Sequence, residues 1–196
     1  MTNGTDVAAF LHDAFELGRH RLKERTCVTA RYSDLVLETL TLDVVDQVSG
    51  TTDIARGYVW RPAEAKGRLP AVLYIHAHGN RYEIGADELV AGRPAFDRPL
   101  APDLARLGAI VFGFDLPCFG QRATVSESAA AKAALWHGRS LAGRMMGELA
   151  AGLDWLKARP DVDADQVGAY GLSMGATFAY WLGAARADLA FVAQAC

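Results

Sequence analysis

The sequence predicts an α/β fold, with one open, mostly parallel sheet and helices on both faces. The first observation is a set of apolar segments that run without alternation, as strands covered on both faces do, at residues 71–76, 109–115, 167–170 and 189–196. The second is that segments with helical periodicity lie between these runs. Strands and helices that alternate along a chain are typical of βαβ units, which place their strands parallel.

The N-terminal third supplies the lead-in and one edge of the sheet within a single domain, residues 1–196. Apolar side chains at intervals of three and four predict an amphipathic helix over 5–25, within an N-terminal region 1–30. Residues 31–60 are rich in Val, Leu, Thr and Tyr and are interrupted by a polar break at 49–53. This pattern predicts an antiparallel hairpin at the sheet edge.

Residues 61–196 form the predicted βαβ core, which we expect to be incomplete at its C-terminal end. A short helix is predicted over 102–107, ended by Gly108. A long helical stretch follows at 128–157, and it carries an apolar stripe together with glycines that favour a bend or a close approach to the sheet. The stripe consists of Leu141, Met145, Leu149, Leu153 and Leu156.

Composition limits the classes of function. The 196 residues are 51% apolar and carry a net charge of −3 without a basic cluster, so the sequence does not predict binding to nucleic acid. The three cysteines fit neither a disulfide framework nor a metal-binding pair, which is typical of a reducing cytoplasm. Neither a signal peptide nor an apolar run of membrane-spanning length is evident. We expect a cytoplasmic protein that acts on a small molecule without a cofactor.

The clearest chemical motif is Gly171-Leu172-Ser173-Met174-Gly175, which follows one apolar strand and opens a helix-compatible run. A serine on a sharp strand-to-helix turn needs small residues two positions before and after it, because the backbone is pinched there. The start of the helix aims unpaired N–H groups at the serine, so negative charge on an attacked acyl oxygen would be stabilised. The motif predicts a nucleophile elbow with Ser173 as the nucleophile and the Met174 N–H as an oxyanion donor.

With this motif and the His78-Gly79 pair after strand 71–76, the sequence resembles the α/β-hydrolase superfamily, in its dienelactone hydrolase-like and acetyl-esterase-like branch. The resemblance covers roughly residues 54–196. It implies a serine hydrolase that acts on carboxylic esters through an acyl-serine intermediate, with a second oxyanion donor from Asn80. Dienelactone hydrolases themselves use a cysteine nucleophile, so the resemblance implies an ester substrate rather than a dienelactone.

The resemblance also implies an acid and a histidine downstream of the nucleophile. No histidine follows Ser173, and the only acid there is Asp188. We therefore expect a truncated hydrolase that lacks the base and acid of its triad. The alternative is an inactive hydrolase-fold fragment that serves as an interaction module. In either case the exposed final strand would favour self-association.

Other polar residues carry weaker predictions. His76 and His78 lie on one side of an extended strand, and a metallo-hydrolase is the second alternative, but Asn80 and Arg81 stand where the HxHxDH motif needs Asp and His. Glu83 and Arg122 lie in loops after parallel strands, where open α/β sheets bind ligands, so both are candidates for binding substrate together with His78. A structural role for His78 in holding the oxyanion loop is the other interpretation.

Overall fold

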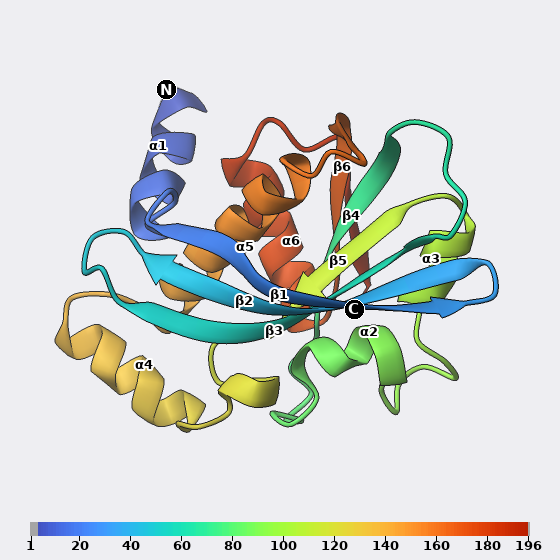
Figure 1. The fold of residues 1–196 in the computed structure, drawn as a ribbon. Helices are drawn as coiled ribbons and strands as arrows, with labels where there is room; N and C mark the ends of the chain where they lie inside the picture. Colours follow the sequence, from blue (N-terminus) through green and yellow to red (C-terminus); the bar gives the residue numbers. More distant parts are fainter. Residues whose placement is uncertain (1–3, 196) are drawn as a thin grey trace.

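The computed structural model describes residues 4–195, which form a seven-stranded sheet in the order β1-β2-β3-β5-β4-β6-β7, with helices on both faces (Figure 1). Residues 1–3 and Cys196, the last residue of the predicted strand 189–196, lie outside the described range. The elements are α1 (Gly4–Ala14), β1 (His20–Tyr32), β2 (Leu35–Asp46), β3 (Thr52–Pro62), β4 (Leu69–Ile75), α2 (Glu88–Ala91), α3 (Ala101–Arg106), β5 (Ile110–Phe114), α4 (Glu127–Trp136), α5 (Leu141–Lys157), β6 (Val162–Leu172), α6 (Met174–Ala185) and β7 (Val192–Ala195).

The sheet is mixed, and its parallel half contains the predicted parallel strands. β4 pairs parallel with both β5 and β6, and β6 pairs parallel with β7. β1, β2 and β3 form an antiparallel meander that joins β5 through a further antiparallel pairing. The predicted α/β class and the hairpin of β2 and β3 are confirmed.

The N-terminal helix is shorter than predicted, and β1 takes the place of its second half. α1 ends at Ala14, Gly18 turns the chain with a φ of +85°, and β1 begins at His20. His20 and Leu22 are buried on alternate positions of this strand, and the helical pattern also includes Leu22. Pairing with β2 along almost the whole of β1 overrides the helical pattern, so a third antiparallel strand forms the edge.

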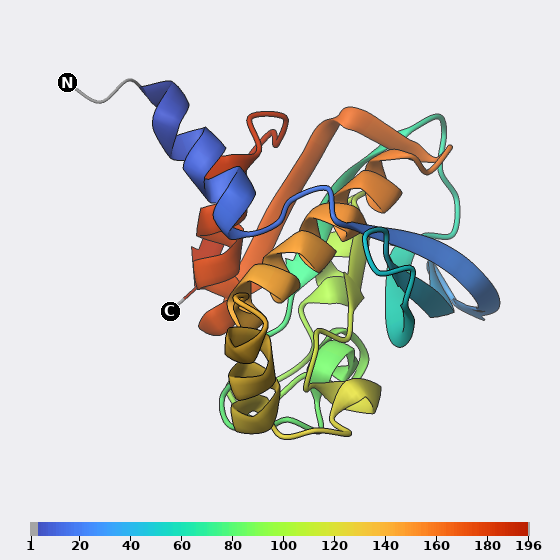
Figure 2. The same cartoon turned by 90° about the vertical axis from the view of Figure 1, so that its left-hand side faces the viewer.

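Apolar cores cover both faces of the sheet. On one face α5 and α6 pack on the central strands, and Figure 2 shows α1 beside α6 at the same side. On the other face α2 and α3 cover β2, β3 and β5 through Leu89, Ala101 and Ala105. All five residues of the predicted apolar stripe are buried in α5. None of the helices within residues 4–195 is long and apolar enough to cross a membrane.

The predicted helical stretch 128–157 is two helices. α4 ends at Trp136, Gly138 has a φ of +68°, and the Ser140 hydroxyl caps the N-terminus of α5 by accepting a hydrogen bond from the Gly143 N–H. α4 has no buried residue, and Trp136 near its C-terminal end is 88% exposed. α4 therefore projects from the core, as the lower part of Figure 1 shows.

Candidate active site

Ser173 lies between β6 and α6, in the predicted strand–turn–helix. Its φ of +54° and ψ of −113° are uncommon for a residue with a side chain and cost of order 1–3 kcal/mol, which the surrounding structure must offset. Gly171 and Gly175 permit this turn, because a Cβ on Gly171 would lie 2.1 Å from the carbonyl carbon and oxygen of Gly175. Close backbone packing thus holds the Ser173 side chain at the surface, where it is exposed.

The main chain around Ser173 is firmly bonded. The Ser173 N–H donates to the Ala195 carbonyl of β7 at 2.8 Å, and the Ser173 carbonyl accepts from the Thr177 N–H at 3.1 Å. Met174 is the first residue of the 12-residue helix α6. Among the described residues no acceptor pairs with its N–H, so this donor and the positive end of the helix dipole are available to an anionic oxygen.

The segment His78-Gly79-Asn80-Arg81 forms a tight turn after β4. Gly79 and Asn80 both have a φ of +54°, and the Arg81 N–H donates to the His78 carbonyl at 3.0 Å, as in a type I′ turn. The Asn80 N–H donates to His78 Nδ1 at 3.0 Å. The second oxyanion donor predicted from Asn80 is therefore already paired in this structure, which differs from the expectation.

His78 joins this turn to α4. Its Nε2 lies 2.9 Å from Glu127 Oε2, and the Tyr82 hydroxyl donates to the same carboxylate oxygen at 2.9 Å. Burial acts to raise the pKa of Glu127, but the hydrogen bonds from His78 and Tyr82 outweigh it and hold that pKa below its ordinary value. Sequence reasoning missed Glu127 and Tyr82, although Ser126 is a good N-cap residue and marks the start of α4.

A cavity of about 590 Å³ lies beside the elbow and extends to this cluster. One end of the cavity is polar and the rest is apolar, which is the usual character of a site for a small organic ligand. Met174 of the nucleophile elbow lines this cavity, and residues of α4 line one side of it. The lining residues are His78, Tyr82, Glu127, Ser128, Ala131, Leu135, Ser140, Leu141, Ala142, Met145, Met174 and Phe178.

The metal site suggested by His76 and His78 does not fit the geometry. His76 is fully buried, its Nε2 accepts from the Leu116 N–H at 3.3 Å, and its Nδ1 lies 3.1 Å from the Ala77 carbonyl. The Phe119 ring contacts both imidazoles, with centroids about 5 Å away in each case. Because each imidazole nitrogen already has a partner, the pair has no lone pair left for a shared ion. No cluster of three metal-binding side chains occurs in the described part of the chain.

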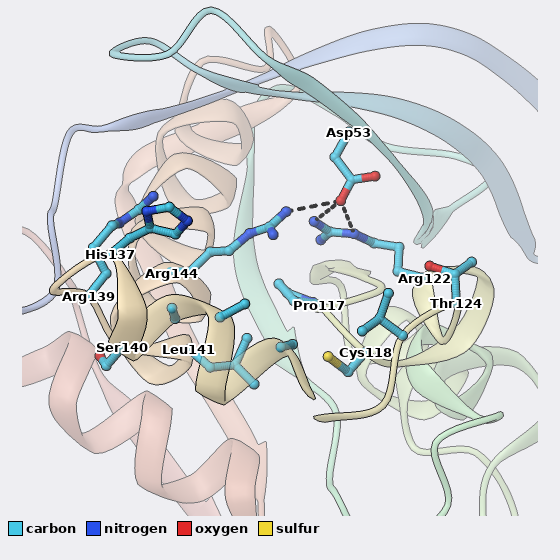
Figure 3. Close-up of a pocket in the computed structure, with 14 residues that line it drawn as sticks. Asp53, Pro117, Cys118, Arg122, Thr124, His137, Arg139, Ser140, Leu141 and Arg144 are labelled. Carbon is cyan, nitrogen blue, oxygen red and sulfur yellow. Dashed lines mark hydrogen bonds and ion pairs between the residues drawn. The ribbon is translucent and has the colours of Figure 1, made fainter. Parts of the chain in front are cut away.

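Arg122, which the sequence suggests as a substrate-binding residue, is engaged in ion pairs and hydrogen bonds within the protein. Its five N–H donors point to Asp53, the Asp115 carbonyl and Glu148, so none remains for a ligand. Arg144 contacts the same two carboxylates, and Figure 3 shows both guanidinium groups directed at Asp53. This ion-pair network borders a second cavity, of about 410 Å³, on the other side of α4. Its two arginines, Arg122 and Arg144, and its two carboxylates, Asp53 and Glu148, balance in charge.

Glu83 is not among the residues that line the elbow cavity. Its carboxylate pairs with Arg81 two positions away, and this hydrogen bond lowers the pKa of Glu83. The side chain is mostly exposed and does not line either cavity. Among the predicted substrate-binding residues, only His78 lies at the cavity beside Ser173.

The described residues leave Ser173 without a base. No histidine or carboxylate in 4–195 is hydrogen-bonded to its hydroxyl, and the imidazole that shares a cavity with Met174, His78, has both nitrogens engaged. The site therefore contains a strained, exposed serine, one free N–H at a helix N-terminus and an adjacent cavity. A serine hydroxyl in this setting can accept an acyl group, but its deprotonation needs a further residue as the base.

Comparison with known proteins identifies the fold. No protein-family model matches the sequence. Over 150 residues the chain is 34% identical to a Bacillus subtilis (strain 168) protein named "Putative hydrolase YtaP", covering 76% of this chain and 48% of that protein. The structure resembles a "putative acetyl xylan esterase" from Bacteroides fragilis NCTC 9343, with a TM-score of 0.74 and 16% identity over 95% of this chain and 50% of the other.

An acetyl xylan esterase from Paenibacillus sp. R4 is similar as well, with a TM-score of 0.64 and 18% identity over 96% of this chain and 58% of that one. The chain thus has the α/β-hydrolase fold, and the resemblance drawn from the elbow is confirmed at this level. It spans about half the length of the proteins it matches.

Proposed function

We propose that Ser173 is the nucleophile of a carboxylic-ester hydrolase. The observation that carries the proposal is the backbone of Ser173, which is held at positive φ by the close approach of Gly171 and Gly175. Strained backbone of this kind is concentrated at functional sites. The hydrolase and esterase names of the similar proteins agree with it.

In this mechanism the Ser173 hydroxyl oxygen attacks the carbonyl carbon of the ester as its proton passes to a base. The Met174 N–H and the dipole of α6 stabilise the negative charge that develops on the carbonyl oxygen. The alcohol leaves with a proton, and water then releases the acid from the acyl-serine. The cavity of about 590 Å³ would hold one of the two groups that flank the ester bond.

We further propose that the catalytic acid and base are not among these 196 residues. The absence of a base at Ser173 in residues 4–195 and the greater length of the similar proteins support this. The short chain would then react through the elbow alone. Triad enzymes that lack a catalytic member keep only about 10³–10⁴-fold acceleration over water, so turnover by this chain would be feeble.

The test is to treat the 196-residue chain, its Ser173→Ala variant and a longer form of the protein with a fluorophosphonate and with small activated esters, acetates first. We expect an adduct on Ser173, vigorous turnover by the longer form alone, and loss of both in Ser173→Ala. Ser128→Ala, which changes a serine in the same cavity, is the matched control and should keep both.

An adduct elsewhere, or equal turnover after Ser173→Ala, would contradict the proposal. No reaction in any form would favour the alternative, in which the hydrolase fold serves as an interaction module. Vigorous Ser173-dependent turnover by the short chain would mean that an upstream histidine acts as the base.

A further inference from the structure

Glu127 is the residue that fastens α4 to the rest of the molecule. Within residues 4–195 it makes the only side-chain hydrogen bonds that link α4 to other elements, through His78 and Tyr82. Ala130 and Ala131 add partly buried contacts to the core, whereas Leu135 and Trp136 at the far end are exposed. α4 is thus held over the cavity mainly at its N-terminal end.

The bond to Glu127 decides which nitrogen of His78 carries a proton. A carboxylate can only accept, so Nε2 must be the donor. Nδ1 of the neutral ring is then an acceptor, and the Asn80 N–H points at it from 3.0 Å. The order of contacts is the Glu127 carboxylate, the two ring nitrogens of His78 and the Asn80 amide.

The far end of this chain of hydrogen bonds is the tight turn that contains Gly79 and Asn80. Asn80 has a φ of +54°, a region that asparagine tolerates but does not require. Its amide is satisfied locally by one side chain and not by a strand or a helix. Loss of the Nδ1 acceptor would free the amide to bond a different oxygen.

We propose that Glu127 is a positioning residue that, by fixing the tautomer of His78, makes the direction of the Asn80 amide depend on how α4 sits over the cavity. A ligand that displaces α4 would release the Asn80 N–H, which could then join the Met174 N–H as an oxyanion donor. This last role rests on the proposed hydrolase function, whereas the coupling between α4 and the turn does not.

The coupling is tested by NMR on the 196-residue chain, without any substrate. In the native protein we expect the imidazole ¹⁵N spectrum to show His78 protonated at Nε2, and the Asn80 amide to be protected from hydrogen exchange. Glu127→Ala should mix the two tautomers and speed exchange of the Asn80 amide by about tenfold, the effect of losing one hydrogen bond. Glu127→Gln should restore most of the protection, because its amide oxygen can still accept from Nε2.

His78→Asn separates positioning from general stabilisation. Its side-chain oxygen can accept from the N–H two residues on, as in an Asx turn, without any link to Glu127. In that background Glu127→Ala should change Asn80 exchange by less than twofold. An equal effect in both backgrounds, or native tautomer and exchange in Glu127→Ala alone, would overturn the proposal.

The Thr177 amide in α6 reports whether each variant is folded. A Ser173 adduct with an uncoupled Asn80 would reject the coupling and leave the hydrolase proposal standing. Coupling between Glu127 and Asn80 without an adduct on Ser173 would support the coupling and contradict the hydrolase proposal.

Discussion

A Cβ atom placed on Gly175 would lie 2.1 Å from the carbonyl oxygen of Ile75. The first turn of α6 is therefore pressed against the end of β4, and the backbone of the elbow touches the strand that leads into the His78–Arg81 turn. This contact fixes the distance between Ser173 and the neighbouring loop through main-chain atoms, which cannot move aside as a side chain can. The elbow is thus built by two strands, β4 and β6, together with α6.

Gly175→Ala should consequently destabilise the protein by at least about 2 kcal/mol, because the added methyl group would have to push two backbone segments apart. Gly183→Ala is the matched control in the same helix, where the added atom meets mainly the Val192 side chain. That side chain can rotate, and alanine favours a helix over glycine, so its cost should stay within about 1 kcal/mol. Urea unfolding measures both, and equal effects would show that the contact with Ile75 is not what constrains the elbow.

Complete burial lowers the pKa of His76 to about 4, well below its ordinary value. Above pH 6.5 the imidazole is neutral in both states and contributes nothing to pH dependence. As the pH falls from 6.5 towards 4, the imidazole is protonated in the unfolded chain but not in the folded protein. The free energy of unfolding therefore decreases. This single group should cost about 2 kcal/mol between pH 7 and pH 5.

The measurement is the free energy of unfolding at pH 7 and pH 5 for the native protein and for His76→Gln. For each protein we take the change in the free energy of unfolding between pH 7 and pH 5. The difference between these two changes is due to His76, because all other titratable groups are present in both proteins. Equal changes would mean that His76 is accessible to protons in the folded state.

β7 pairs with β6 on one side, and no other strand within residues 4–195 covers its second edge. Phe191 and Val192 are 44% and 37% exposed beside it. Unpaired edges of this kind recruit further strands, so the 196-residue chain should self-associate as its concentration rises. Sedimentation velocity should show dimers or larger species that Gln194→Lys reduces, since a lysine on an edge strand disfavours pairing. A monomer at all concentrations would contradict the prediction.

Structural features that depend on residues close together in the sequence could be predicted from it. The strands around Ile75, Phe112 and Ala169 are continuous apolar runs. The turn at Ser173 is specified by five consecutive residues, so the strands and the turn could both be predicted. The β1 strand could not, because its register comes from pairing with β2, while its own pattern also suits a helix.

The contacts of the site residues that the sequence did not reveal join distant positions. His78 and Glu127 are 49 residues apart, and Arg122 and Asp53 are 69 apart. Arg122 looks like a ligand-binding arginine in a loop until its carboxylate partners are known. Similarly, the Asn80 amide looks available until the rotamer of His78 brings Nδ1 to it.

The pair of Arg122 and Glu148 gives the last prediction. Both side chains are almost completely buried, and the carboxylate lies between two guanidinium groups, those of Arg122 and Arg144. Burial acts to raise the pKa of Glu148, but the charge of Arg122 outweighs it and holds that pKa below the ordinary value. Since the folded-state pKa is depressed, this stabilisation is present above the unfolded pKa and is lost as the pH falls through the folded one.

Glu148→Gln leaves the buried Arg122 without one of its two carboxylates and should cost about 3 kcal/mol at pH 7, close to the penalty for breaking a buried pair. Asp154→Asn is the matched control on α5, where an exposed carboxylate pairs with Arg186, and it should cost no more than about 1 kcal/mol. Labelling of Ser173 by a fluorophosphonate should keep its rate in folded Glu148→Gln, because the network serves the scaffold and not the elbow. A slower reaction without loss of stability would instead return Arg122 to the substrate-binding role that its loop position first indicated.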